Sequence, residues 1–198
     1  KEYGGYFTNV SSDWTLSPHQ EKMIVSQSRH IWTLAKVSAY INSNSDYRSM
    51  ALHGYPYLKN KMLDNEYGGF YQIRSREGGL SDVNGWRNEK RTYGNAFAIY
   101  ALAALYELTH DEEVLHFAQQ AYKWIEEHAF DPTYKGYFEF LTREGQPFDR
   151  HSEYQTIASD GNELGFKDQN SSIHLLEAYS ELYHVWKDPD FILSSNRF

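Results

Sequence analysis

The stretch YGGFY at residues 67–71 decides the fold, because nearly the same five residues occur three times along the chain. The other copies are YGGYF at residues 3–7 and, more loosely, YKGYF at residues 134–138. The spacing between copies, 64 and then 67 residues, is typical of a repeat architecture. We therefore expect one domain over residues 1–198, with repeats of approximately 1–64, 65–131 and 132–198.

Each copy should form a tight turn or short hairpin that is followed by two helices. Glycine accepts a positive φ, and the flanking aromatic residues favour strand. The first helix is expected to open with Ser17 as N-cap, Pro18 at the first helical position and Gln20 completing a capping box. Apolar periodicity and further caps predict helices at residues 17–42, 46–63, 90–108, 111–128 and 167–186, and the start of a sixth at residues 188–189.

The expected helices alternate between two kinds. Residues 96–106 are an unbroken run of eleven apolar or aromatic residues, which predicts a helix that is buried all round. The helix at residues 111–128 instead carries one apolar stripe among charged residues, as an outer helix would. Inner and outer helices repeated in this way stack into a toroid or an open solenoid. We favour an all-α (α/α) toroid, because its glycine turns would then all lie at one rim.

Composition excludes several classes of protein. The formal net charge of −8 argues against a nucleic-acid groove, which needs a basic face. There is no cysteine, so disulfides and thiolate chemistry are excluded, and the histidines have no spacing typical of a metal site. No apolar run approaches the roughly 20 residues that cross a bilayer, so we expect no membrane association and a cytoplasmic location. An aromatic content of 17% suits a protein that handles sugars, because flat rings match their apolar faces.

One polar stripe runs along the helix expected at residues 167–186. Its members, at spacings of four, three, four and three, are Asn170, His174, Glu177, Glu181 and His184. On a surface helix such a stripe is simply solvated, and that is the commoner case. In a toroid, however, the polar stripe of an inner helix faces the bore, where a ligand would bind. His174 is then a candidate proton donor, proton acceptor or partner of a sugar hydroxyl, because histidine titrates near neutral pH.

Two earlier helices carry further candidates. Arg29 lies three residues before Trp32 in an apolar stretch, and it either reaches solvent or points into a polar cavity, where it could hold a sugar oxygen. Tyr93 and Phe97 are one turn apart and are either core aromatics or part of a pocket wall. The acidic caps expected for the second helices also suggest a register. Asp46, Asp111 and Asp188 follow Arg29, Tyr93 and Asn170 by 17, 18 and 18 residues, which predicts that the latter three occupy matching places.

Three segments resemble the N-acylglucosamine 2-epimerase superfamily, which includes disaccharide 2-epimerases and aldose–ketose isomerases. They are SQSRHIW at residues 26–32, YGNAFAIY at 93–100 and KDQNSSIHLLEAY at 167–179, with the glycine turns between them. The resemblance implies an (α/α)6 barrel, of which this chain would be roughly the N-terminal half. It assigns Arg29 to substrate oxygens near C1 and C2. The other substrate-binding residues are then Trp32, Tyr93, Phe97, Asn170 and His174.

The resemblance also implies a reaction. Members move a proton at C2 of an open-chain aldose through an enediolate, and no metal or redox cofactor is implied. The family's two proton-transferring histidines, one of them in a Gly-His-x-x-Glu segment, lie in the second half of the barrel, and this sequence has no such segment. The chain alone should therefore bind sugar weakly without turnover, with Arg29 and His174 in supporting catalytic roles. Ser172 stands where disaccharide epimerases usually carry histidine, which disfavours a disaccharide substrate.

Two other functions stay open. A glycoside hydrolase or polysaccharide lyase built on an (α/α) barrel would need a carboxylate pair in the bore. A non-catalytic, sugar-binding half-barrel would instead cover its open side by forming a homodimer, because large apolar patches are rarely left bare on a soluble monomer. In the fragment interpretation the missing C-terminal half covers the same side.

Overall fold

The computed structural model describes residues 2–41, 45–81, 87–153, 163–188 and 191, and this part of the chain is mostly helical. The helices are α1 (Ile24–Tyr40), α2 (Ser45–Tyr57) with its π-helical continuation η1 (Leu58–Met62), α3 (Thr92–Thr109), α4 (Glu112–His128) and α5 (Gln169–Val185). The strands are β1 (Lys22–Met23), β2 (Ile73–Arg74), β3 (Lys90–Arg91) and β4 (Phe140–Leu141). None of the described helices is long and apolar enough to cross a membrane.

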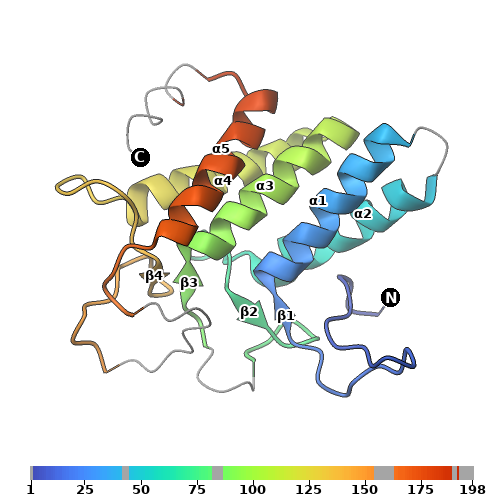
Figure 1. The fold of residues 1–198 in the computed structure, drawn as a ribbon, viewed down its shortest axis with the longest axis horizontal. Helices are drawn as coiled ribbons and strands as arrows, with labels where there is room; N and C mark the ends of the chain where they lie inside the picture. Colours follow the sequence, from blue (N-terminus) through green and yellow to red (C-terminus); the bar gives the residue numbers. More distant parts are fainter. Residues whose placement is uncertain (1, 42–44, 82–86, 154–162, 189–190, 192–198) are drawn as a thin grey trace.

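The helices form two layers around one hydrophobic core. α3 packs between α1 and α5, and these three make the inner layer; α2 packs on α1 and α4 packs on α3 from behind (Figure 1). α3 is buried from Gly94 to Leu105 with the exception of Tyr100, whereas α4 buries only its apolar stripe. The expected alternation of inner and outer helices is therefore confirmed. Its cause is the composition of α3, which has no polar face to turn toward solvent.

The first helix begins later than its capping signal predicts. Its N-cap is Met23 and not Ser17. The side chain of Gln20 forms no capping box, because it is buried and bonds to the backbone of Thr8, Asn9 and Ser17 in the preceding loop. The chain then stays extended through β1, which pairs with β2. α1 ends at Tyr40, and its expected end at residue 42 lies outside the described residues.

The other helix bounds follow the sequence more closely. α3 and α5 each begin two residues later than expected, at Thr92 and Gln169, because β3 occupies residues 90–91 and Asp168 caps α5 through the N–H groups of Asn170 and Ser171. Asp111 caps α4 as expected. The sixth helix expected from residues 188–189 falls outside the described residues except at its edges.

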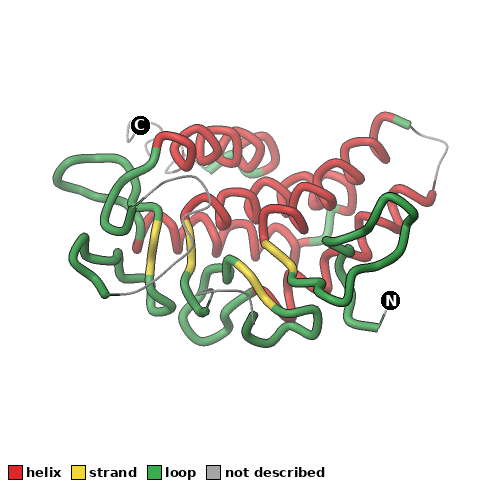
Figure 2. The backbone as a smooth tube through the Cα atoms, turned by 60° about the horizontal axis from the view of Figure 1, so that its bottom comes forward, coloured by secondary structure: helices red, strands yellow, loops and turns green. Residues whose placement is uncertain are grey.

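The three glycine turns share one backbone geometry. Each has two consecutive residues at positive φ, which are Gly4 and Gly5, Gly68 and Gly69, and Lys135 and Gly136. The bridges between Leu63 and Phe70 and between Phe130 and Tyr137 close the second and third turns into short hairpins. The predicted tight turns are therefore confirmed. The strands that adjoin these turns in sequence lie at one end of the inner helices (Figure 2).

A lysine holds each turn, and Lys22 and Lys90 are buried whereas Lys167 is partly exposed. Lys22 Nζ donates to Gly4 O at 2.6 Å, Lys90 Nζ donates to Gly68 O at 2.5 Å, and Lys167 Nζ donates to Lys135 O. Each inner helix starts two residues after its lysine. These equivalent bonds align the three inner helices with one another more directly than the acidic residues at the starts of the outer helices do.

This register corrects the one predicted from the acidic caps. Arg29, Phe97 and His174 each follow their lysine by seven residues and are each the sixth residue of their helix. Tyr93 and Asn170 do match each other, as second residues of α3 and α5, but Arg29 lies one turn deeper. The prediction failed because Asp46 follows Lys22 by 24 residues, whereas Asp111 and Asp188 follow their lysines by 21. Asp46 also lies in the first turn of α2, which begins at Ser45, and is therefore not the expected N-cap.

Replacing Gly69 by alanine should destabilise the protein by about 2 kcal/mol. An alanine at φ +67 is strained, and its Cβ would lie 2.7 Å from the Trp124 ring, which must then move. Gly79→Ala is the matched control, because its Cβ would meet only Ser75 Oγ at 3.6 Å. Urea unfolding of both variants measures the difference. Equal losses in the two variants would show that the close approach of turn and ring is not the cause.

Candidate functional site

The candidate residues lie in three successive layers along the inner helices. Tyr93 and Asn170, as second helical residues, form the layer nearest the strands. Arg29, Phe97 and His174 form the next layer, one turn further along. Trp32, Tyr100 and Glu177 are each the ninth residue of their helix and form the third layer. The helical spacing of the sequence thus places nearly all the predicted site residues on one side of the inner layer.

The central layer is a compact contact between three helices. The Arg29 guanidinium lies over the Phe97 ring, 4.7 Å from its centre, and the rings of Phe97 and His174 are also 4.7 Å apart. Phe97 is 4% exposed, whereas Arg29 is exposed, so the ring forms the floor and the guanidinium lies above it. A cation held over an aromatic face keeps its N–H groups free to turn toward a ligand.

His174 is oriented by its own helix. Its Nδ1 lies 2.7 Å from Glu177 Oε2, one turn along α5. A carboxylate at Nδ1 fixes the tautomer in which Nδ1 carries the proton and leaves Nε2 as the acceptor. The Tyr93 ring meets the edge of the His174 ring at 5.0 Å and that of Phe97 at the same distance. Arg29, Tyr93, Phe97 and His174 are therefore brought together by the fold.

Asn170 and Trp32 lie outside this cluster. Asn170 is exposed on the first turn of α5, and its backbone N–H donates to the cap Asp168. Trp32 stacks on Tyr100 with ring centres 4.7 Å apart and planes 16° apart, and its Nε1 donates to Glu181 Oε1 at 3.4 Å. A groove of about 660 Å³ opens beside Tyr100 between α1, α3 and α5. In that groove Lys36 bridges Glu107 at 2.6 Å and Glu181 at 2.9 Å.

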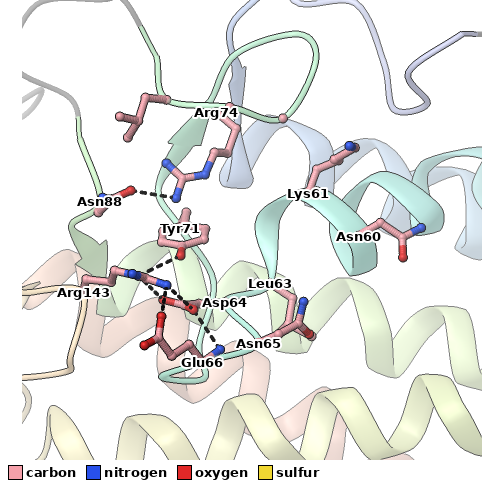
Figure 3. Close-up of a pocket in the computed structure, with 13 residues that line it drawn as sticks. Asn60, Lys61, Leu63, Asp64, Asn65, Glu66, Tyr71, Arg74, Asn88 and Arg143 are labelled. Carbon is pink, nitrogen blue, oxygen red and sulfur yellow. Dashed lines mark hydrogen bonds and ion pairs between the residues drawn. The ribbon is translucent and has the colours of Figure 1, made fainter.

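A second polar centre lies among the strands and turns, outside the inner face. Asp64 accepts from Arg143 Nε at 2.9 Å and pairs with Lys90 Nζ at 3.0 Å, and its own side chain is almost fully buried. Arg143 also donates to Tyr71 Oη, and Arg74 lies over the Tyr71 ring, so these side chains face one pocket of about 380 Å³ (Figure 3). Burial would raise the pKa of Asp64, but the bonds from Arg143, the backbone and Lys90 hold it well below its ordinary value. This network ties the second turn to the third unit.

Glu139 connects the starts of α3 and α5. Its Oε2 accepts from the Tyr93 backbone N–H at 3.0 Å and from Ser171 Oγ at 2.7 Å, and the residue is 2% exposed. Burial raises the pKa of Glu139 to about 7, although Ser171 and the Tyr93 N–H oppose the shift. Glu139 therefore joins the first turns of α3 and α5, the turn that carries Tyr93 and the turn that precedes His174.

Stability should fall as the pH rises because of this carboxyl. Its pKa is raised from 4.5 to about 7 on folding, so the stabilisation is complete below pH 4.5 and is lost as the pH rises to 7. The loss should be on the order of 3 kcal/mol. Glu139→Gln should remove this part of the pH dependence, whereas the exposed control Glu127→Gln should keep it. Urea unfolding at pH 5 and pH 8 is the measurement, and an unchanged pH profile in Glu139→Gln would contradict the assignment.

Several of these residues were missed by the sequence interpretation. Tyr100 and Lys36 each lie one turn beyond the last candidate on their helix, although Tyr100 has the same spacing from Phe97 as Trp32 has from Arg29. Glu139 stands three residues after Gly136, as Gln72 does after Gly69, so the repeat marks its position. The sequence cannot show that it is buried. Among the described residues no three acidic, histidine or cysteine side chains gather as a metal site would require.

Comparison with known proteins agrees with this arrangement. A family model described as N-acylglucosamine 2-epimerase matches residues 5–197. The cellobiose 2-epimerase of Bacteroides fragilis is 33% identical over 189 residues, which are 95% of this chain and 45% of that protein. A solved cellobiose 2-epimerase from Bacillus thermoamylovorans matches with a TM-score of 0.81 at 28% identity. The match covers 96% of this chain and 46% of the chain of that epimerase. The chain thus spans less than half the length of these relatives.

More distant structures share the fold. A D-mannose isomerase has a TM-score of 0.75 at 20% identity, and a family 76 glycoside hydrolase from Bacteroides thetaiotaomicron has 0.68 at 20%. The expected fold class is confirmed, because the described helices match about half of an (α/α)6 barrel. The family model covers nearly every residue of the sequence, and the three resembling segments around Arg29, Tyr93 and His174 all fall within it. The chain belongs to the N-acylglucosamine 2-epimerase family.

Proposed function

We propose that this chain is the N-terminal half of the barrel of a sugar 2-epimerase or aldose–ketose isomerase. One observation carries the proposal. The sixth residues of three neighbouring inner helices, Arg29, Phe97 and His174, form one contact cluster with a cation, an apolar floor and an imidazole. Relatives named as cellobiose 2-epimerase and D-mannose isomerase support the reaction class.

Each side chain has a role that its geometry permits. Arg29 would hold the oxygens at C1 and C2 and stabilise the negative charge that develops on them in the enediolate. Phe97 and Tyr93 would pack against the sugar carbons, and His174, oriented by Glu177, would accept a hydrogen bond from a hydroxyl through Nε2. Asn170 would bind at the strand end of the site, and Trp32 with Tyr100 would line its deeper side.

The two groups that move the C2 proton are expected from the other half of the barrel. The isolated chain should accordingly bind sugar weakly and not exchange the C2 proton, because general acid–base transfer is the reaction itself. The test is incubation in D2O with N-acetylmannosamine, mannose or cellobiose while NMR follows the C2 proton. A longer protein that continues this chain should exchange one of them. Rapid exchange by the isolated chain would refute the half-site proposal, and reducing-sugar release from an oligosaccharide would point to hydrolysis.

Exposed apolar residues on α5 indicate a surface that another part of the protein or a second chain would cover. Ile173 and Leu176 of α5, the last helix of the inner layer, are 48% and 56% exposed. We propose that the rest of the barrel packs there in a longer protein, and that a homodimer covers it when the chain is alone. Light scattering distinguishes the cases, because a sharp dimer at low concentration supports self-association and polydisperse aggregates support an incomplete barrel. A cytoplasmic location is part of the same proposal.

A further inference from the structure

An ion-pair bridge crosses the inner layer one turn beyond Trp32. Lys36 Nζ lies 2.6 Å from Glu107 Oε2 and 2.9 Å from Glu181 Oε2, so one lysine of α1 joins a carboxylate of α3 to a carboxylate of α5. α3 lies between α1 and α5 and packs against both (Figure 1). The bridge therefore ties together the two helices that flank α3.

The helix register explains why this bridge can form. Lys36 and Glu181 are each the thirteenth residue of their helix, and the thirteenth residue of α3 is Ala104. Ala104 is buried and its side chain is one methyl group, so it leaves room over α3 for the bridge. Burial would lower the pKa of Lys36, but the carboxylates of Glu107 and Glu181 raise it above its ordinary value. The lysine is therefore charged at neutral pH.

Glu181 uses its other oxygen to bind the aromatic stack of Trp32 and Tyr100. Its Oε1 accepts from Trp32 Nε1 at 3.4 Å, while its Oε2 pairs with Lys36. A hydrogen bond of this length is longer than the ordinary range, so it orients the indole only if the carboxylate is itself held in place. Lys36 holds that carboxylate. The two contacts of Glu181 together set the angle at which the Trp32 ring faces Tyr100.

We propose that Glu181 is a positioning residue of the sugar site, and that it acts by holding Trp32 against Tyr100 as the deep wall of the site. This wall lies one turn beyond the layer of Arg29 and Phe97, and the rings of Phe97 and Tyr100 meet edge to face with centres 6.2 Å apart. A fixed aromatic wall at that depth would pack against the apolar face of a sugar whose oxygens Arg29 holds. The inference rests on the proposed sugar site, but the link between Glu181 and Trp32 can be measured without sugar.

The first test follows the Trp32 indole N–H by NMR of the isolated chain labelled with ¹⁵N at tryptophan, with Trp32→Phe used to assign the signal. Glu181→Ala should shift this signal and increase its exchange with solvent about fivefold, because one hydrogen bond is lost. Glu107→Ala is the matched control, since it also removes one carboxylate from Lys36 but leaves Glu181 in place. It should leave the signal unchanged. If both variants give the same Trp32 signal, the proposal is overturned.

The second test asks whether the wall serves the sugar, in a longer protein that contains this chain. Glu181→Ala should raise KM for C2 proton exchange about tenfold and leave kcat within about twofold, because a wall that binds substrate and transition state equally affects KM alone. Glu107→Ala should change neither value. In a Trp32→Ala background, Glu181→Ala should have no further effect, since Glu181 acts only through that ring. An unchanged KM in Glu181→Ala, or an equal loss in the Trp32→Ala background, would contradict the proposal.

Failure of this inference is distinct from failure of the proposed reaction. If the longer protein exchanges the C2 proton of no sugar, the reaction class is wrong, and the dissociation constant for mannose or cellobiose replaces KM in the same variants. Weaker binding in Glu181→Ala, with unchanged binding in Glu107→Ala, still supports the wall. If neither sugar moves the Trp32 signal of the longer protein, or if both variants bind as the unchanged protein does, the proposal is overturned.

Discussion

Replacing Asp64 by asparagine is expected to lower the free energy of unfolding by about 4 kcal/mol, because removal of one partner leaves a buried charge uncompensated. Lys90 is fully buried, and among the described residues it would keep the carbonyls of Gly68 and Arg143 as acceptors. Asparagine keeps the size of the side chain and can still accept from the turn N–H groups. The loss therefore reports the ion pair and not the turn. Urea unfolding at pH 7 measures it.

The equivalent replacement in the third unit is the matched control. Asp131 pairs with Lys167, whose side chain is 29% exposed, so water can replace the lost partner. Asp131→Asn should cost clearly less than Asp64→Asn. The pH dependence has a defined sign as well. Since the folded pKa of Asp64 is lowered, its stabilisation is present above the unfolded pKa and is lost as the pH falls through the folded one. Equal losses in both variants would mean that burial of the pair is not what matters.

Arg29→Ala is expected to reduce C2 proton exchange by about 10³-fold in a longer protein that contains this chain, because the guanidinium stabilises charge that forms only in the transition state. The loss should fall mainly on kcat. Arg29→Lys should recover part of the rate, since it restores charge without the planar pair of donors. The free energy of unfolding should hardly change, because Arg29 is exposed and its guanidinium stacks over the face of the Phe97 ring.

Arg48→Ala provides the control for this experiment. Arg48 is a surface residue of α2 whose guanidinium donates to Leu108 O, away from the inner face. Its replacement removes the same charge from the protein and should leave exchange within twofold of the unchanged enzyme. If Arg29→Ala also stays within twofold, the arginine does not hold the reacting oxygens, and the proposed role of the central layer fails.

Much of the fold could be predicted because local signals agreed with the final structure. The glycine pairs needed positive φ, the apolar run of α3 had to be buried, and Asp111 capped the helix that it preceded. The start of α1 could not be predicted in the same way. Ser17, Pro18 and Gln20 form a good capping signal, but Gln20 is used by a loop contact and the following residues by a strand from the next unit.

The candidate site was predicted in part for a related reason. Helical spacing placed His174 and Glu177 on one stripe and Tyr93 and Phe97 one turn apart, and the fold keeps these neighbours. Alignment between helices depends on non-local contacts, namely the bonds from Lys22, Lys90 and Lys167 to their turns, and so the matching of Arg29 with Phe97 became visible only in the structure. Burial of Glu139 likewise depends on two helix ends that are distant in sequence.

Two strand pairs connect consecutive repeats of the chain. β1, which leads into α1, pairs with β2 of the second unit, and β3, which leads into α3, pairs with β4 of the third. During synthesis on a ribosome, the strand before α1 would therefore lack its pairing strand until residue 74 has emerged. The strand before α3 would lack its own until residue 141 has emerged. The backbone amides of β1 and β3 that pair with the later strands should stay open to hydrogen exchange until β2 and β4 have been made. The strand pairs of each repeat would then form only after the following repeat has been synthesised.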